Sequence, residues 1–178
     1  MKQWIKKVFP ELVPLYNEKQ IADRVGYLAC LINADYKDKE LAVVLLYNGS
    51  FIFAADLLRQ LHLPLEMHGF SVKSYTGKKS VGKLKFDKHD IPDCKDKHVV
   101  LVDDVLDTGL TMSEIKAIFE KQGALSIKVC CLLNKKSNRK KEIHADYVGF
   151  EINDEFVLGY GLDLDNKYRQ LPFIGYIP

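Results

Sequence analysis

The chain has few of the residues that would place it in a specialised class of protein. Its 178 residues include only six prolines, one tryptophan and four cysteines. The cysteines lack metal-ligand spacing, and three stand in apolar or helical contexts, so we expect buried thiols in a reducing compartment. They are Cys30, Cys94, Cys130 and Cys131. The net charge of +2 gives no reason to invoke nucleic acid as a partner.

Long hydrophobic runs are also missing. The N-terminus carries Lys2, Lys6 and Lys7 without the apolar region of a signal peptide, and no later run is long enough to span a membrane. We therefore expect a cytoplasmic protein with no membrane partner. The hydrophobic fraction of 47% and charged fraction of 28% are typical of a soluble globular protein. No repeat or linker divides the chain, so we expect one domain over residues 1–178.

The most informative stretch is residues 99–111, VVLVDDVLDTGLT. Its aliphatic start is typical of a strand buried on both faces. The stretch turns through Gly109 into an amphipathic helix that Gly123 is placed to end, and Thr111 and Glu114 have capping-box spacing. A strand that turns through glycine into a helix offers backbone N–H groups and a positive dipole end, which suit an anion and usually a phosphate.

Three carboxylates crowd the same stretch, those of Asp103, Asp104 and Asp107. Like charges this close repel and raise one another's pKa, so a partner should offset them. A divalent cation or the hydroxyls of a sugar would do so, and together with the amides they would form a site for a phosphorylated sugar. The alternative is a solvated acidic turn at the end of a strand.

This stretch closely resembles the phosphoribosyl-pyrophosphate (PRPP) signature of type I phosphoribosyltransferases. The resemblance covers residues 17–175. Within the family, it is to the 6-oxopurine subgroup, the bacterial hypoxanthine-guanine enzymes. It implies an α/β fold with a central, mainly parallel sheet flanked by helices, and a small hood built from the N- and C-terminal segments. It also implies purine salvage, in which 5-phosphoribosyl moves from PRPP to N9 of hypoxanthine or guanine, giving IMP or GMP and pyrophosphate.

The remaining elements suit that fold. Asn17 and Gln20 can cap a helix whose apolar stripe runs from Ile21 to Ile32. The other expected elements are strands at 41–46, 65–72, 127–133 and 147–152 and a helix at 51–61.

A second strand–glycine–helix junction follows the strand at 41–46. In the family this junction is the pyrophosphate loop, where a Lys-Gly dipeptide is usual and is joined by a non-proline cis peptide. Here Asn48 stands in the place of the lysine, before Gly49. The change removes a positive charge, so we expect the loop to act mainly through backbone amides.

Two basic segments are open to more than one interpretation. Residues 73–88 form either a solvated hairpin or a mobile lid over a polyanion, and the match of Ser74 and Tyr75 to the family's flexible catalytic loop favours the lid. The run 134–141 is expected to be solvated except for Lys135, which follows a buried strand at the sheet edge where α/β proteins bind ligands.

The resemblance also implies a role for each site residue. Asp107 is the expected acid/base at purine N7, and the 5′-phosphate binds over Asp107, Thr108, Gly109, Leu110 and Thr111. Asp103 and Asp104 hold the ribose hydroxyls, directly or through Mg²⁺. Pyrophosphate is held by Asn48, Gly49 and Arg169. The purine is held by Lys135 at O6, Phe156 in stacking, the Val157 backbone and Asp163. The expected cofactor is Mg²⁺, held by Asp103, Asp104 and Asp163, and the expected assembly is a homodimer or homotetramer.

Two other classes of function remain open from the residues alone. A receiver-type signalling domain also has an acidic pair after an apolar strand, although it carries the pair near its first strand. An RNA-binding regulator on the same fold would use the lysines of residues 73–88 and 135–141, although the purine-reading residues argue against it.

Overall fold

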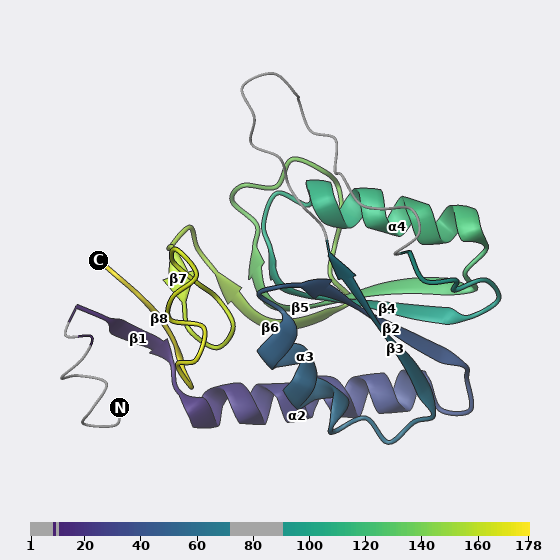
Figure 1. Cartoon of the computed structure of the whole chain (residues 1–178), viewed down its shortest axis with the longest axis horizontal. Coiled ribbons are helices and arrows are strands. Elements are labelled where there is room, and N and C mark those ends of the chain that lie inside the picture. Colours follow the sequence, from purple (N-terminus) through teal and green to yellow (C-terminus); the bar gives the residue numbers. More distant parts are fainter. Residues whose placement is uncertain (1–8, 10, 72–90) are drawn as a thin grey trace.

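Two sheets and three helices make up the part of the chain that the structure describes. It is a computed structural model that describes residue 9 and residues 11–71 and 91–178 (Figure 1). The helices are α2 (Glu18–Asp35), α3 (Phe51–Leu58) and α4 (Leu110–Gln122). The strands are β1 (Val13–Tyr16), β2 (Leu41–Tyr47), β3 (Leu65–Ser71), β4 (His98–Leu106), β5 (Ser126–Lys135), β6 (Tyr147–Ile152), β7 (Val157–Leu158) and β8 (Ile174–Tyr176). None of these helices is long and apolar enough to cross a membrane.

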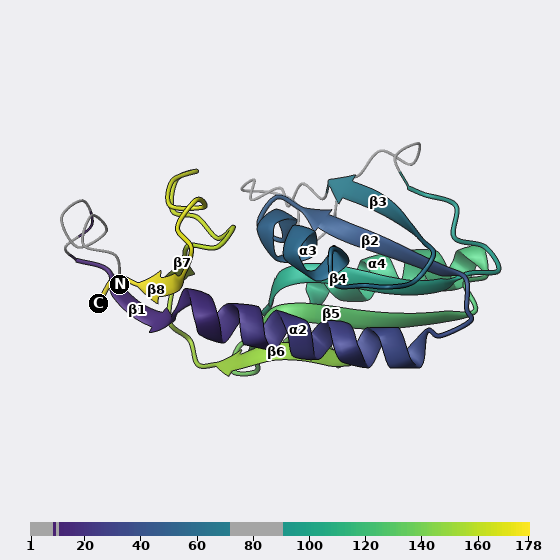
Figure 2. The same ribbon diagram turned by 90° about the horizontal axis from the view of Figure 1, so that it is seen from below.

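The larger sheet has five strands in the order β3-β2-β4-β5-β6, and every neighbouring pair is parallel. Helices α2 and α3 cover one face and α4 covers the other (Figures 1 and 2). The expected central parallel sheet flanked by helices is therefore confirmed. Because all five strands run in the same direction, their carboxyl ends meet at one edge, where α/β sheets bind ligands.

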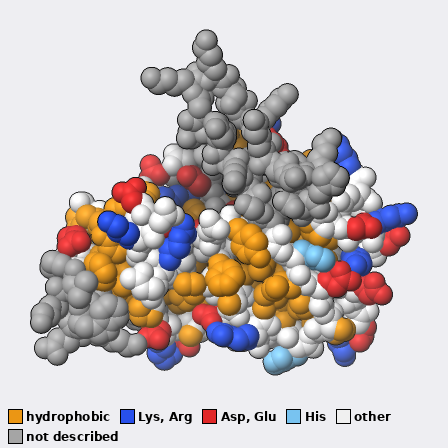
Figure 3. Space-filling view, in the orientation of Figure 1, with side chains coloured by type: hydrophobic (Ala, Val, Ile, Leu, Met, Phe, Trp, Pro, Cys, Tyr) orange, Lys and Arg blue, Asp and Glu red, His pale blue; other side chains and the backbone are white. Residues whose placement is uncertain are grey.

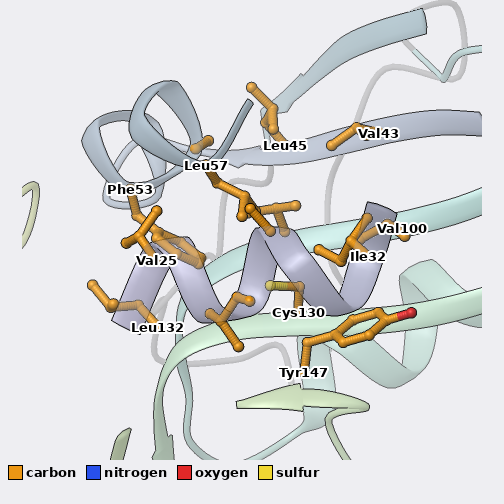
Figure 4. Close-up of a cluster of buried hydrophobic side chains, with 14 of the residues drawn as sticks. Val25, Ile32, Val43, Leu45, Phe53, Leu57, Val100, Cys130, Leu132 and Tyr147 are labelled. Carbon is orange, nitrogen blue, oxygen red and sulfur yellow. The ribbon is translucent and has the colours of Figure 1, made fainter. Parts of the chain in front are cut away.

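Continuous apolar runs form the inner strands. Residues 41–46 of β2 and 99–102 of β4 are fully buried, since helices cover both faces of the sheet. Under α2 and α3, side chains from six elements pack together (Figure 4). Val25, Phe53, Val43, Val100 and Cys130 are among them. This core fixes the two covering helices against the strands that lead into the site.

The expected cap of α2 is confirmed. The Asn17 side chain accepts from the Gln20 amide, and the Gln20 side chain accepts from the Asn17 amide, each at 2.9 Å. The helix then buries its predicted apolar stripe. Helix α3 is shorter than predicted, because it ends at Leu58 and the chain turns from Arg59 to Leu61.

The cysteine prediction is partly wrong. Cys94, Cys130 and Cys131 are buried free thiols, but Cys30 is exposed on α2. Cys30 lies off the buried stripe of that helix, so a helical context alone did not imply burial.

The two ends of the chain meet in the smaller sheet, whose strand order is β1-β8-β7. Val13 pairs with Tyr176, and Leu158 pairs with Gly175, both antiparallel. This sheet lies beyond the start of α2, at one end of the molecule (Figure 2). It holds the C-terminal segment of residues 159–169 close to the carboxyl edge of the larger sheet.

Hydrophobic side chains gather on the face that carries α3 and the adjoining strands (Figure 3). Phe51, Met67 and Tyr47 contribute, with 59%, 54% and 37% of their surfaces exposed. Helix α3 is too short to cover β3, the edge strand of the sheet, and so leaves this apolar patch in solvent.

Candidate active site

The carboxylates of Asp103 and Asp104 lie inside β4 rather than after it, because this strand runs four residues further than predicted. The ladder between β4 and β5 pairs Asp103 with Cys131 and Val105 with Leu133 but skips Asp104. Two amides at this point bond to side chains: Asp104 N donates to Asp103 Oδ1 at 3.0 Å, and Val105 N donates to Asp104 Oδ1 at 2.9 Å. The acidic pair therefore braces an interruption of the strand.

The same interruption crosses two more strands. The ladder between β5 and β6 pairs Cys131 with Val148 and Leu133 with Phe150, and it skips the pair between them, Leu132 and Gly149. A Cβ atom on Gly149 would overlap with the Leu132 carbonyl, so only glycine fits there without a shift. The register is the same on both sides of each skipped pair, so the strands continue without a bulge.

The charged form of the Asp103 carboxyl group is disfavoured in the free protein. Burial, and then the charge of the neighbouring Asp104, raise the pKa of Asp103 well above its ordinary value. Two adjacent carboxylates that repel each other suit a hard divalent cation such as Mg²⁺. Such a cation binds oxygen ligands and takes several of them from water or substrate. The described residues gather no group of three or more His, Cys, Asp or Glu side chains. Within the described part of the chain, the acidic pair would therefore supply only part of such a cation's shell.

The turn after β4 leads directly into α4. Gly109 takes the N-cap position with a φ of 76°, and no described side chain caps the helix. The predicted capping box at Thr111 and Glu114 is therefore wrong, since α4 begins before Thr111. The Leu110 amide donates to the Thr108 hydroxyl at 3.4 Å, and the amides that follow it in the first turn are open to an anion. Asp107 Oδ1 is shielded from solvent and has no hydrogen-bond partner among the described residues.

The turn between β2 and α3 lies directly against the acidic pair. A Cβ atom on Gly49 would overlap with the Asp104 carboxylate, so the two segments are in close contact. A non-proline cis peptide is present, but it joins Tyr47 to Asn48 rather than Asn48 to Gly49 as predicted. Ser50, which is buried, donates its hydroxyl to the Leu46 carbonyl and closes the turn.

The C-terminal segment supplies the third wall. A Cβ atom on Gly161 would overlap with the Gly49 carbonyl. Arg169 Nη1 donates to the Gly161 carbonyl at 2.6 Å, and Arg169 Nη2 pairs with Asp163 Oδ1 at 2.7 Å. A hollow of about 460 Å³ opens beside this contact. Its lining residues are Tyr47, Asn48, Phe51, Ile52, Gly161, Asn166, Arg169 and Gln170, of which Arg169 alone is charged.

Lys135 is the last residue of β5 and is buried, which is unusual for a lysine. Its Nζ donates to the Glu155 carbonyl at 2.7 Å, immediately before Phe156 and Val157. Phe156 exposes 58% of its surface, and Val157 is buried in β7. The structure thus brings the three predicted purine-reading residues Lys135, Phe156 and Val157 together.

Arg139 is a site residue that the sequence analysis missed, because it stands in the run expected to be solvated. Its guanidinium donates to the Leu106 and Lys135 carbonyls at 3.2 Å, to Asn134 Oδ1 at 2.6 Å and to the Ile143 carbonyl at 2.9 Å. It therefore ties the ends of β4 and β5 together. The only sequence signal was an arginine among lysines, since its rigid fork suits several fixed acceptors.

Two predicted site residues, Ser74 and Tyr75, lie outside the described residues, with the rest of the predicted loop at 73–88. The other predicted site residues all lie at or near the carboxyl edge of the larger sheet.

Comparison with known proteins agrees with this site. A phosphoribosyl transferase domain model matches residues 14–165. The hypoxanthine phosphoribosyltransferase of Haemophilus influenzae is 39% identical over 165 residues, covering 90% of this chain and 92% of that protein. The hypoxanthine-guanine phosphoribosyltransferase of Bacillus subtilis is 37% identical over 176 residues, covering 98% and 94%.

Solved structures agree as well. The crystal structure of a hypoxanthine phosphoribosyltransferase from Staphylococcus aureus superposes with a TM-score of 0.91 at 33% identity, covering 97% of this chain and 95% of that one. Similarity at this level extends over the whole architecture. The chain belongs to the type I phosphoribosyltransferases, in their hypoxanthine-guanine branch.

Proposed function

We propose that this protein transfers 5-phosphoribosyl from PRPP to N9 of hypoxanthine or guanine, giving IMP or GMP and pyrophosphate in purine salvage. The observation that carries the proposal is the close contact of three distant segments, at Gly49, Asp104 and Gly161. Each segment supplies one part of a site for a sugar diphosphate and its acceptor base.

The phosphoribosyl group fits the turn after β4. The amides of residues 108–111 and the Thr108 and Thr111 hydroxyls would hold the 5′-phosphate. Asp103 and Asp104 would hold the ribose 2′- and 3′-hydroxyls, directly or through Mg²⁺. Bound Mg²⁺ supplies positive charge to the diphosphate, and Asp163 is a further oxygen ligand on the pyrophosphate side.

The leaving group fits the wall between Asn48 and Arg169. Backbone amides at Asn48 and Gly49 would face pyrophosphate, and the Arg169 guanidinium would clamp its oxygens. With Asn48 in place of the usual lysine, Arg169 is the cation that lines this hollow. Departure of pyrophosphate leaves an oxocarbenium-like ribosyl, so a stabilised leaving group and a positioned base matter more than a nucleophilic side chain.

The purine fits between Lys135 and Phe156. The Lys135 ammonium, already aimed at the Glu155 carbonyl, would also donate to purine O6. The exposed ring of Phe156 would stack on the base, and the Val157 backbone would read its edge, with Asp163 close enough in sequence to assist. Asp107, whose Oδ1 is buried and unpaired, would exchange a proton with N7.

The rest of the molecule supports this role as one phosphoribosyltransferase domain. Residues 73–88, including Ser74 and Tyr75, would close over the bound diphosphate, and the chain ends would form the hood above the base. We further propose that the protein is cytoplasmic. We also propose that it forms a homodimer or homotetramer, because Phe51, Met67 and Tyr47 expose an apolar patch beside the site.

Calorimetry with Mg²⁺ and PRPP, without any base, tests the assignment. Replacing Arg169 with Gln should weaken PRPP binding about tenfold or more, because a charge-assisted clamp is lost. The matched control is Lys167→Gln, an exposed cation on the same segment, which should bind PRPP as the unaltered protein does. Equal binding by Arg169→Gln and Lys167→Gln would contradict the pyrophosphate assignment.

A further inference from the structure

Tyr160 stands in the middle of the segment that carries the third wall of the site. The side chain is 6% exposed, and its backbone has a φ of 52° between Gly159 and Gly161, whose φ values are 91° and 102°. Gly159 and Leu162 close this tight turn with two backbone hydrogen bonds of 3.1 Å. A tyrosine rarely adopts a left-handed conformation, so the surrounding structure holds it there.

The phenol of Tyr160 crosses from this turn to α3. Its hydroxyl donates to Asp56 Oδ2 at 2.6 Å, a contact between residues 104 positions apart. Asp56 also pairs with Arg59, the residue that follows the end of the same helix. Helix α3 begins at Phe51, immediately after the turn at Asn48 and Gly49. The hydrogen bond therefore links the pyrophosphate turn, through its own helix, to the C-terminal segment.

The next residue of the turn makes the direct contact. Gly161 packs against the Gly49 carbonyl, its amide donates to the Arg169 carbonyl at 2.9 Å, and its carbonyl accepts from the Arg169 guanidinium. A rotation of the turn would move Gly161 and, with it, the Arg169 side chain. The Tyr160 amide holds the turn to the Leu171 carbonyl at 2.8 Å, and the Tyr160 hydroxyl is the side-chain contact that ties the turn to α3 and opposes this rotation.

We propose that Tyr160 is a positioning residue whose hydrogen bond to Asp56 holds Arg169 and Asp163 in register with the pyrophosphate turn. This inference rests on the proposed roles of Arg169 and Asp163. The hydroxyl does not touch the reacting atoms and acts through Gly161. Its loss should weaken the hold on the diphosphate and leave the binding of the purine base unchanged.

The chain supplies a matched control. Tyr147 at the start of β6 donates its hydroxyl to Asp35 Oδ2, also at 2.6 Å, and is 3% exposed. This pair lies at the amino end of the sheet, opposite the site. Tyr160→Phe and Tyr147→Phe therefore each remove one partly buried phenol-to-aspartate hydrogen bond, and Tyr147→Phe also removes a contact from Lys128 Nζ at 3.3 Å. Only the Tyr160 bond borders the site.

The test compares the two variants by steady-state kinetics, by calorimetric titration of each protein with pyrophosphate in the presence of Mg²⁺, and by thermal unfolding. Tyr160→Phe should raise the KM for PRPP and the Kd for pyrophosphate about 3- to 30-fold, with the KM for hypoxanthine within about twofold. Tyr160→Phe and Tyr147→Phe should lower Tm by similar amounts. Tyr147→Phe should leave the two KM values and the Kd for pyrophosphate unchanged. Asp56→Ala should reproduce the effect of Tyr160→Phe, and the double variant should add nothing further.

Two results would overturn the inference. One is a Tyr160→Phe variant that loses stability but keeps the KM for PRPP, which would make the bond merely structural. The other is an equal kinetic effect of Tyr147→Phe. The Arg169→Gln variant distinguishes failure of the site assignment from failure of the positioning role. If Arg169→Gln also leaves PRPP binding intact, the site assignment is wrong. If Arg169→Gln weakens PRPP binding strongly and Tyr160→Phe does not, only the positioning role is refuted.

Discussion

Asp107 has a buried carboxylate oxygen that lacks a hydrogen-bond partner among the described residues. An unpaired buried oxygen is costly, and it is tolerated where a ligand supplies the missing hydrogen bond. A protonated purine nitrogen would supply it here.

Replacing Asp107 with Asn should therefore slow turnover by about 10²–10⁴-fold, the usual contribution of general acid–base catalysis. The fold should persist, because Asn matches Asp in size and Oδ1 makes no hydrogen bond with the described residues that the substitution would break. The measurement is kcat at saturating substrates, together with Tm. Full activity in a folded Asp107→Asn variant would rule out the acid/base role.

Lys135 and Lys136 are adjacent lysines in different environments. Lys135 is buried and donates to the Glu155 carbonyl, whereas the Lys136 side chain is 73% exposed and pairs with Glu151 at 3.0 Å. Lys135→Met should raise the KM for hypoxanthine about tenfold or more, because a charged hydrogen bond to O6 is lost, and leave the KM for PRPP nearly unchanged.

Lys136→Met is the control and should leave both KM values unchanged, since its ion pair is solvated. If the two variants behave alike, Lys135 does not read the purine.

At the scale of elements, the interruption across β4, β5 and β6 does most to shape the site. There the Asp104 and Val105 amides bond to the acidic pair, and position 149 requires glycine. Gly149→Ala should destabilise the protein by about 1–3 kcal/mol, because the added methyl overlaps with the backbone of β5. Denaturant unfolding measures this loss.

Gly26→Ala is a useful comparison, since Gly26 lies within α2 and an added methyl would approach only the end of the Gln60 side chain, at 3.2 Å. It should stabilise the helix by about 0.5–1 kcal/mol. A Gly149→Ala variant as stable as Gly26→Ala would show that the strands relax around the methyl at no cost.

The inner elements could be predicted from the sequence because their signals are local. The buried run of β2 and the stripe and cap of α2 reflect periodicity and side-chain chemistry within a few residues. The missed features depend on distant contacts. Strand β4 extends through Asp103 and Asp104 only because β5 pairs with it, and Arg139 is ordered only because the ends of two strands place four acceptors around it.

At the scale of the whole molecule, topology gathers the site. A parallel sheet brings the turns after β2 and β4 and the end of β5 to one edge, and the pairing of β1 with β8 brings in the C-terminal segment. The resemblance predicted which residues belong to the site. It could not predict the Gly49–Asp104 and Gly161–Gly49 contacts, which depend on how these segments pack.

The most direct test of the account is initial rates with PRPP and Mg²⁺ against hypoxanthine, guanine and adenine, followed in the ultraviolet. The account predicts turnover of hypoxanthine and guanine, which carry O6, and none of adenine, which offers Lys135 an amino group instead of an acceptor. Turnover of adenine would contradict the assignment of Lys135. A folded protein that turns over none of the three bases would contradict the proposed function itself.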